Sequence, residues 1–244
     1  MKFTYRYQIK WHDTDANRQV LPSQILAYMQ ETSNYHLISA GMSLDELRDR
    51  YGLAFLLSRI SMRIYQPLYA GDEIEVQTWV CESRGLSFHR CFRIVRGEET
   101  VAEAFSIWAL LDLNTQRLLP STAFPYQIEP EPPLGGELAA RIRLPALATM
   151  QEVGERTIVY SDIDYNGHMN NTRYPNMLCD FTPDIRARRA TGITLSFLHE
   201  AAYGHTLKIY RSERAGGYDF RTVDQDGTTC LEAVLMLEPI DPLH

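Results

Sequence analysis

The sequence predicts an α+β protein made of two copies of one unit, each a long helix packed on a curved antiparallel sheet. Three observations lead to this fold class. Segments of the first half recur in the second half, apolar residues near the N-terminus have helical spacing, and a later segment alternates strictly between apolar and polar residues.

The repeat consists of three sequence blocks that occur in the same order in both halves. The segment HDTDANRQVL at 12–21 matches SDIDYNGHMN at 161–170, at an offset of 149. Residues 59–77 match residues 192–210 at an offset of 133, and 92–104 match 220–233 with one inserted residue. Three matches in order indicate a tandem duplication.

The helix of the first copy is predicted over residues 23–40, because its apolar residues have roughly helical spacing and Gly41 is placed to end it. These residues are Leu26, Met29, Leu37 and Ala40. The sequence SLDE at 43–46 resembles a capping box that opens a short second helix. In the second copy, Pro175 and Pro183 should shorten or kink the corresponding helix.

The strands follow the helices in each copy. Residues 73–80 alternate with the period of two that is typical of a half-buried strand. The inward-facing set is Ile74, Val76, Thr78 and Val80, and the outward-facing set is Glu73, Glu75, Gln77 and Trp79. Residues 88–95 and 100–111 continue the sheet around a turn at 96–98. Prolines and glycines in FPYQIEPEPPLGGE predict a surface linker, so we expect domains at 1–125 and 146–244 joined by 126–145.

Composition excludes several classes of protein. Lys and Arg number 24 against 31 Asp and Glu, a net charge of −7, which argues against a nucleic-acid-binding protein. The four cysteines form no CxxC pair, so neither a zinc knuckle nor a disulfide framework is indicated. The N-terminus lacks an apolar signal core, and no apolar run reaches the roughly 18 residues of a membrane span. We therefore expect a cytoplasmic protein without membrane insertion.

The densest polar cluster, SDIDYNGHMNNTRY at 161–174, has several interpretations. A calcium loop would use Asp162, Asp164 and Asn166, but Arg173 stands where a bidentate Glu is required. A zinc site would need further His or Cys ligands beside His168. The remaining structural interpretation is an Asx-rich turn that caps a helix.

The same cluster resembles the signature of the acyl-acyl carrier protein (acyl-ACP) thioesterases of plants and bacteria. The resemblance rests on Asp164, Asn166, His168, Asn170, Asn171 and Tyr174, and on the segment GITLSFLHE at 192–200, similar to the family's strand that ends in a catalytic Glu. It covers essentially the whole chain and implies a tandem, or double, hot-dog fold. It also implies that the reaction is hydrolysis of fatty acyl-ACP, which releases free fatty acid and ends fatty acid synthesis.

The resemblance implies a catalytic group made of Asp164, Asn166, His168 and Glu200. Thioester hydrolysis needs a positioned water, a base and donors for the oxyanion, but no metal or organic cofactor. Glu200 and His168 would hold and deprotonate the water, with Glu200 the base if its carboxylate is partly buried and its pKa raised. Asn166 would position the water or the thioester carbonyl, and Asp164 would fix His168 or Asn166. Backbone amides near Asn170 and Asn171 are candidate oxyanion donors.

Other residues of the motif keep two interpretations. Asn170, Asn171 and Tyr174 would contact substrate, or would be structural caps and a domain contact. Plant members often have Cys after the Glu, whereas this chain has Ala201, so a cysteine nucleophile is excluded there, and Cys179 is interpreted as a packing residue.

The first copy has Gln19 and Pro67 where the second has His168 and Glu200. We therefore expect a catalytically silent first domain that supplies the acyl pocket. Candidate lining residues are Met29, Phe55, Leu57, Ile60 and Trp108, each of which could equally belong to an ordinary core.

The expected partner, acyl carrier protein, is acidic, so an acidic enzyme needs a local basic patch to bind it. The strongest basic cluster contains Arg186, Arg188 and Arg189, and the second contains Arg141 and Arg143; a solvated helix end explains either equally well. A fused pair of units is compatible with a monomer and with a homodimer. The alternatives are an acyl-CoA thioesterase, a 3-hydroxyacyl dehydratase and a non-catalytic acyl-binding module. The dehydratase is disfavoured because its motif has a Pro between Asn and His, whereas here Gly167 directly precedes His168.

Overall fold

The computed structural model describes residues 2–126, 128–134, 138 and 140–240. Within them, eleven strands form one sheet in the order β1-β3-β4-β5-β2-β8-β11-β10-β9-β7, with β6 paired to β5. The first half supplies β1 (Phe3–Gln8), β2 (Leu53–Ile64), β3 (Glu73–Arg84), β4 (Ser87–Arg96), β5 (Glu99–Asp112) and β6 (Arg117–Leu119). The second half supplies β7 (Gln151–Thr157), β8 (Arg188–Phe197), β9 (Thr206–Arg214), β10 (Gly217–Val223) and β11 (Thr229–Pro239).

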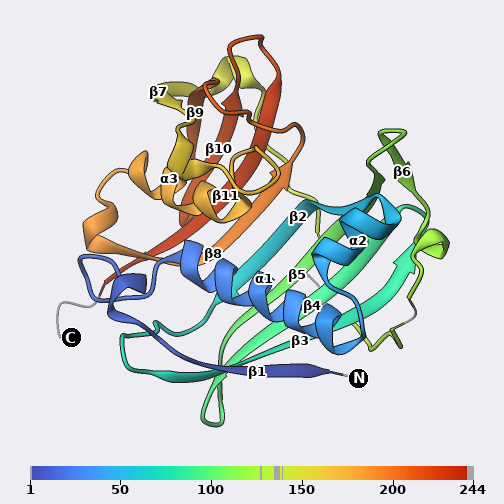
Figure 1. Ribbon diagram of the computed structural model, residues 1–244. Coiled ribbons are helices and arrows are strands. Elements are labelled where there is room, and N and C mark those ends of the chain that lie inside the picture. The colour runs from blue at the N-terminus through green and yellow to red at the C-terminus, as the bar shows by residue number, and fades with distance from the viewer. Residues whose placement is uncertain (1, 127, 135–137, 139, 241–244) are drawn as a thin grey trace.

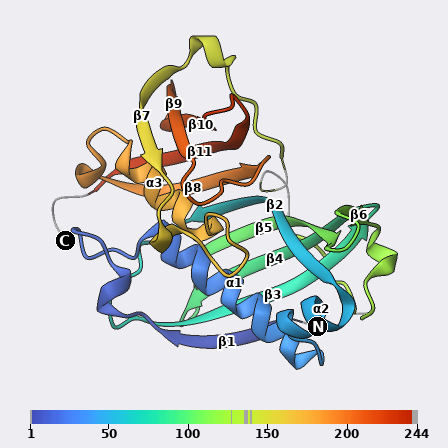
Figure 2. The ribbon, with the colours of Figure 1, turned by 45° about the horizontal axis from the view of Figure 1, so that its top comes forward.

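The long helix α1 (Pro22–Ser39) lies against the first-half strands, with α2 (Leu44–Tyr51) beyond its C-terminal end (Figures 1 and 2). Its predicted extent is confirmed to within one residue. Pro22 occupies the first turn, where its missing N–H breaks no helical bond, and Gly41 follows the helix at φ +90°. The predicted cap of α2 is also present, because the N–H of Glu46 donates to Ser43 Oγ at 3.0 Å.

The second half departs from the expected long helix. Its helix α3 (Tyr174–Asp180) has only seven residues. Pro175 lies in its first turn, where proline is tolerated, and Pro183 follows its end, so the prolines shorten the helix without kinking it. Within the described residues, no helix is long and apolar enough to cross a membrane.

Strand β3 follows the predicted alternation as far as Thr78, after which one expectation is wrong. Trp79 was expected on the outer side of a half-buried strand, yet it is only 2% exposed. The linker covers it: Trp79 Nε1 donates to the carbonyl of Pro132 at 2.9 Å, and Leu138 packs on the same cluster. The linker therefore buries the outer face of this part of the sheet.

The two halves meet at the antiparallel pair β2 and β8. Arg59 pairs with Ser196 and Arg63 with Gly192, so the pairing is symmetric under the predicted offset of 133. At its centre Ser61 faces Thr194, and the Thr194 hydroxyl donates to Ser61 Oγ at 3.1 Å. A pseudo-twofold axis thus passes through the middle of the sheet, which confirms the repeat and the α+β class.

Candidate active site

A cavity of about 1120 Å³ lies between the two halves. The first half contributes residues of α1, α2, β2 and β5 to its wall, and the second half contributes the segments 164–174 and 197–201. All the predicted residues of the motif line it, together with Glu200: Asp164, Asn166, His168, Asn170, Asn171 and Tyr174. The structure therefore brings the residues of the two separate sequence segments to one site.

Backbone pairing places His168 beside Glu200. His168 forms an isolated antiparallel bridge with Ala202, and the N–H of Met169 donates to the Ala201 carbonyl at 2.9 Å. The side chains then meet, with Nε2 of His168 3.0 Å from Oε2 of Glu200. This separation is within the ordinary contact range of an imidazole nitrogen and a carboxylate oxygen.

The pair is accessible to water, because the side chains of His168 and Glu200 are 37% and 56% exposed. The burial that would favour Glu200 as the base is therefore modest. The feature that favours these two residues as the proton-transfer groups is the contact between His168 Nε2 and Glu200 Oε2.

The turn before His168 is held by its own polar groups. Asp164 Oδ1 accepts the N–H of Asn166 at 2.8 Å, and the Asp164 carbonyl accepts the N–H of Gly167 at 2.9 Å. Gly167 has φ +86°, a conformation that favours glycine. Asp164 thus shapes the backbone of the turn, and among the described contacts its carboxylate does not reach the His168 ring.

Arg48 of α2 reaches across to the motif, a contact that the sequence did not reveal. Its Nη1 donates to Asn166 Oδ1 at 2.8 Å, and its guanidinium lies 5.7 Å from the centre of the Tyr165 ring. The first half therefore orients a side chain of the second-half motif. No local pattern could have shown this, because the two partners are 118 residues apart.

The three remaining motif residues have different environments. Asn170 caps the short 3₁₀ helix Asn171–Arg173, with its Oδ1 accepting the N–H of Thr172 at 2.9 Å, as the structural interpretation expected. Tyr174 is 2% exposed and packs edge-on against Phe197, with ring centroids 5.3 Å apart. Burial raises the pKa of its hydroxyl strongly. The backbone N–H of Asn171 has no hydrogen-bond acceptor among the described residues, whereas that of Asn170 donates to Asp162.

The two cysteines of the second half do not supply a nucleophile to the catalytic pair. Burial raises the pKa of Cys179 to about 12 and that of Cys230 to about 11, so both remain thiols at neutral pH. Ala201 is buried and contributes only its carbonyl to the pairing with Met169.

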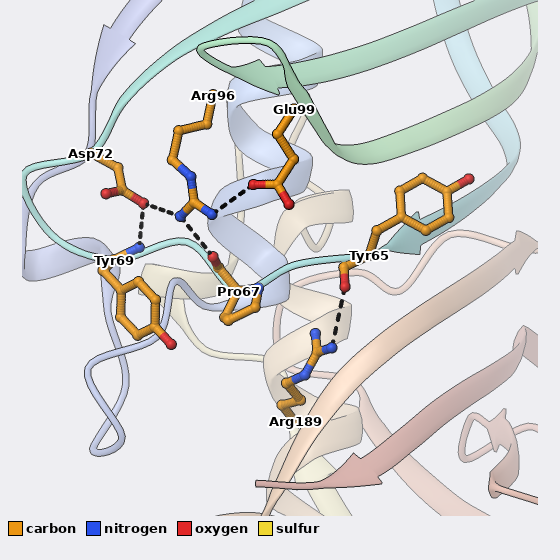
Figure 3. A network of polar contacts seen from close by, with 7 residues as sticks. All are labelled: Tyr65, Pro67, Tyr69, Asp72, Arg96, Glu99 and Arg189. Carbon is orange, nitrogen blue, oxygen red and sulfur yellow. Dashed lines mark hydrogen bonds and ion pairs between the residues drawn. The ribbon is translucent and has the colours of Figure 1, made fainter. Parts of the chain in front are cut away.

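The first half contains the same turn without the catalytic pair. Asp15 Oδ1 accepts the N–H of Asn17 at 2.8 Å, and Gln19 bridges Tyr69 as His168 bridges Ala202. At the position of Glu200, the carbonyl of Pro67 accepts a hydrogen bond from Arg96, whose guanidinium also pairs with Asp72 at 2.9 Å and Glu99 at 3.0 Å (Figure 3). An arginine–carboxylate network thus fills this place.

The predicted basic cluster lies away from the cavity. Arg189 donates to the Tyr65 carbonyl (Figure 3) and pairs with Glu238, and Arg188 lies over the Tyr218 ring. Arg186 is exposed in the 3₁₀ helix that precedes β8. Glu200 follows the other end of this ten-residue strand, about 30 Å away. The structure therefore does not bring these arginines to the catalytic residues, and docking of a carrier on them stays a prediction.

The expected apolar lining is divided between cavity and core. Phe55, Leu57 and Trp108 line the cavity, whereas Met29 and Ile60 belong to the core shared by both halves.

Comparison with known families covers most of the chain. Residues 1–122 match the model of the acyl-ACP thioesterase N-terminal domain, and residues 148–234 match that of the C-terminal domain. The chain belongs to the acyl-ACP thioesterase family. The palmitoyl-acyl carrier protein thioesterase of Arabidopsis thaliana is 23% identical over 225 residues, 84% of this chain and 54% of that protein. The chain thus spans about half the length of the curated relatives it matches.

Solved structures of the same family show the same fold. An acyl-ACP thioesterase from Bacteroides thetaiotaomicron has a TM-score of 0.86 and 22% identity, over 97% of this chain and 98% of that one. The 12:0-ACP thioesterase of Umbellularia californica has a TM-score of 0.85 and 19% identity, over 98% of both chains. This likeness confirms the predicted double hot-dog fold.

Proposed function

We propose that this protein hydrolyses the thioester of fatty acyl-ACP, releases the free fatty acid and so ends fatty acid synthesis. The observation that carries the proposal is the pair of His168 Nε2 and Glu200 Oε2, 3.0 Å apart in the wall of a large cavity. Membership of the acyl-ACP thioesterase family supports the same substrate class.

In the proposed mechanism a water molecule attacks the thioester carbonyl carbon. The His168–Glu200 pair takes the proton of this water, the carbon–sulfur bond then breaks, and the thiolate leaves with a proton returned by the pair. The N–H of Asn171, which has no acceptor within the described part of the chain, is the candidate donor to the oxyanion, while Asn166, held by Arg48, orients the water or the carbonyl. These groups suffice for the reaction, because a thioester already has a good leaving group.

Thiol release from acyl-ACP substrates tests this proposal. Glu200→Gln and His168→Gln should each lower kcat by about 10²- to 10⁴-fold, the usual contribution of general acid–base catalysis. Gln19→Ala, at the first-half counterpart of His168, is the matched control and should leave kcat within about twofold of wild type, since the first half is proposed to be silent. Full activity in both catalytic variants would overturn the assignment.

The partner and the organisation of the chain follow from the same proposal. The proposed partner is acyl carrier protein with its acyl chain, and a higher kcat/KM for acyl-ACP than for acyl-CoA of equal chain length separates this function from that of an acyl-CoA thioesterase. The proposed domains are 1–125 and 146–244, joined by 126–145, with the acyl chain held mainly by the first. A homodimer stays a prediction.

We also propose a cytoplasmic location without membrane insertion. The plant relatives differ in this respect, because the palmitoyl- and oleoyl-acyl carrier protein thioesterases of Arabidopsis thaliana are chloroplastic. All four cysteines are free, and Sγ of Cys81 lies 3.4 Å from Sγ of Cys91 without a bond between them. The support for this location is the wide spacing of the four cysteines in the sequence, which form no CxxC pair.

A further inference from the structure

The first-half wall of the cavity contains a buried arginine. Arg90 of β4 lines the cavity and is 7% exposed. Its neighbours on the same side of the strand are Phe88 and Phe92, so the guanidinium lies in an otherwise apolar stretch of this strand. A cation in such a place is costly unless an anion pairs with it.

The hydrogen bonds of Arg90 go to neutral groups. Its Nη1 lies 3.1 Å from His36 Nδ1 and 3.1 Å from Thr78 Oγ1. Burial, followed by the charge of Arg90, lowers the pKa of His36 to about 4, while burial lowers the pKa of Arg90 only to about 10. At neutral pH the histidine is therefore uncharged and the arginine retains its positive charge.

Several other arginines with partly buried side chains have carboxylate partners. Arg93 pairs with Glu103, and Arg221 pairs with Glu232, at 2.6 and 2.5 Å. Among the described residues, no carboxylate pairs with Arg90. Arg90 thus differs from Arg93 and Arg221, whose charges are neutralised by a paired carboxylate.

Further unsatisfied polarity lies in the same cavity wall. Nε2 of Gln30, on α1, is buried without a hydrogen-bond partner, and Gln30 lines the cavity. Trp108 of β5 also lines the cavity, and its Nε1 donates at 2.8 Å to Oγ of Ser106, the β5 residue that pairs with Arg90. The cavity therefore has a polar region in its first-half wall in addition to the catalytic residues.

Sheet register gives the separation of Arg90 from the catalytic pair. Arg90 pairs with Ser106, Ser106 with Ile60, and Ile60 with Leu195. Arg90 is thus three strand spacings across the sheet from Leu195, and Glu200 lies five residues further along the chain. With about 4.8 Å per strand and about 3.3 Å per residue, the two Cα atoms are at most about 22 Å apart. An acyl chain with its thioester at Glu200 can place its distal end near Arg90.

We propose, on the basis of the proposed hydrolase function, that Arg90 binds the distal end of the acyl chain and that the cavity accepts acyl groups ending in a carboxylate. The guanidinium would form a charge-assisted pair with this carboxylate, and the Gln30 amide would donate to it. Arg90 is then a specificity-determining residue for a thioester of a dicarboxylic acid.

The first test compares three ACP thioesters of equal chain length, ending in a carboxylate, a hydroxyl or a methyl group. Wild type should have the highest kcat/KM for the carboxylate, about tenfold or more above the other two, the usual effect of a hydrogen-bonded charge pair. Arg90→Met should remove this preference, and Arg90→Lys should retain part of it. Arg84→Met, at an exposed arginine outside the cavity wall, is the matched control and should keep it.

Normal hydrolysis of the methyl-ended substrate without a preference for the carboxylate would overturn the role of Arg90 and leave the proposed function intact. Equal rates for hydroxyl and carboxylate ends would also overturn it, because charge would then be irrelevant.

A binding measurement keeps the inference testable if no thioester is hydrolysed or if Arg90→Met does not fold. Calorimetry with Glu200→Gln should show the free dicarboxylic acid binding about tenfold more tightly than the monocarboxylic acid of the same length. Equal or weaker binding of the dicarboxylic acid would refute the anion-binding role.

Discussion

The contact between His36 and Arg90 should make the stability of this protein sensitive to mild acid. The ordinary histidine pKa of 6.5 is lowered to about 4 in the folded protein. Between these values the unfolded chain binds more protons than the folded chain, so stability is complete above pH 6.5 and is lost as the pH falls towards 4. The first physical cause is that burial disfavours the charged imidazolium, and the second is that protonation would place it 3.1 Å from the Arg90 guanidinium.

The size of this effect follows from the two pKa values. At pH 5 the loss attributable to His36 is roughly 2 kcal/mol, and by pH 4 it approaches roughly 3 kcal/mol. Replacement by His36→Gln supplies a neutral side chain whose oxygen can accept from Arg90 but cannot titrate.

Urea unfolding followed by tryptophan fluorescence at several pH values between 7 and 4.5 measures this loss. The wild-type free energy of unfolding should fall about 2 kcal/mol more than that of His36→Gln between pH 7 and pH 5. Parallel curves for the two proteins would refute the reasoning.

Three further perturbations test other contacts. Arg48→Met should lower kcat/KM about two- to tenfold through loss of its hydrogen bond to Asn166. Arg50→Met on the same helix is the control, and equal kcat/KM values in the two variants would show that the contact with Asn166 does not contribute to catalysis. Arg186→Glu should raise KM several-fold for acyl-ACP but not for acyl-CoA if the carrier docks on that cluster, whereas equal effects exclude docking there. Gly217→Ala should cost about 2 kcal/mol or more in thermal unfolding, because its Cβ would lie 2.0 Å from the Leu235 carbonyl oxygen, and an unchanged Tm would contradict this packing.

The sequence predicts those parts of the fold whose information is local or repeated. The turn that contains Asp164 and the helix that ends shortly before Gly41 depend on neighbouring residues. The repeat offset already implies that β2 and β8 are equivalent strands. Sequence reasoning fails where partners are distant in the chain. The cover that the linker places over Trp79 is an example, because Pro132 and Leu138 carry no signal of what they touch.

The candidate site shows the same division. His168 and Glu200 follow from the motif and its resemblance to a family, and the structure adds that their side chains are in contact. Arg48 and Arg90 could not be found in this way. Arg48 is an ordinary surface residue of a short helix until α2 meets the second half, and Arg90 is one charged residue in a strand until His36 and the cavity wall surround it.

The symmetric junction between β2 and β8 has a consequence for truncated forms of the chain. Separation of the halves would leave Arg59–Arg63 in one fragment and Gly192–Ser196 in the other as unpaired edge strands. Because the junction is symmetric about Ser61 and Thr194, each fragment presents an edge shaped to accept a second copy of itself. Each isolated half should therefore form homodimers, and mixing the two halves should convert these homodimers into heterodimers joined by the β2–β8 pair.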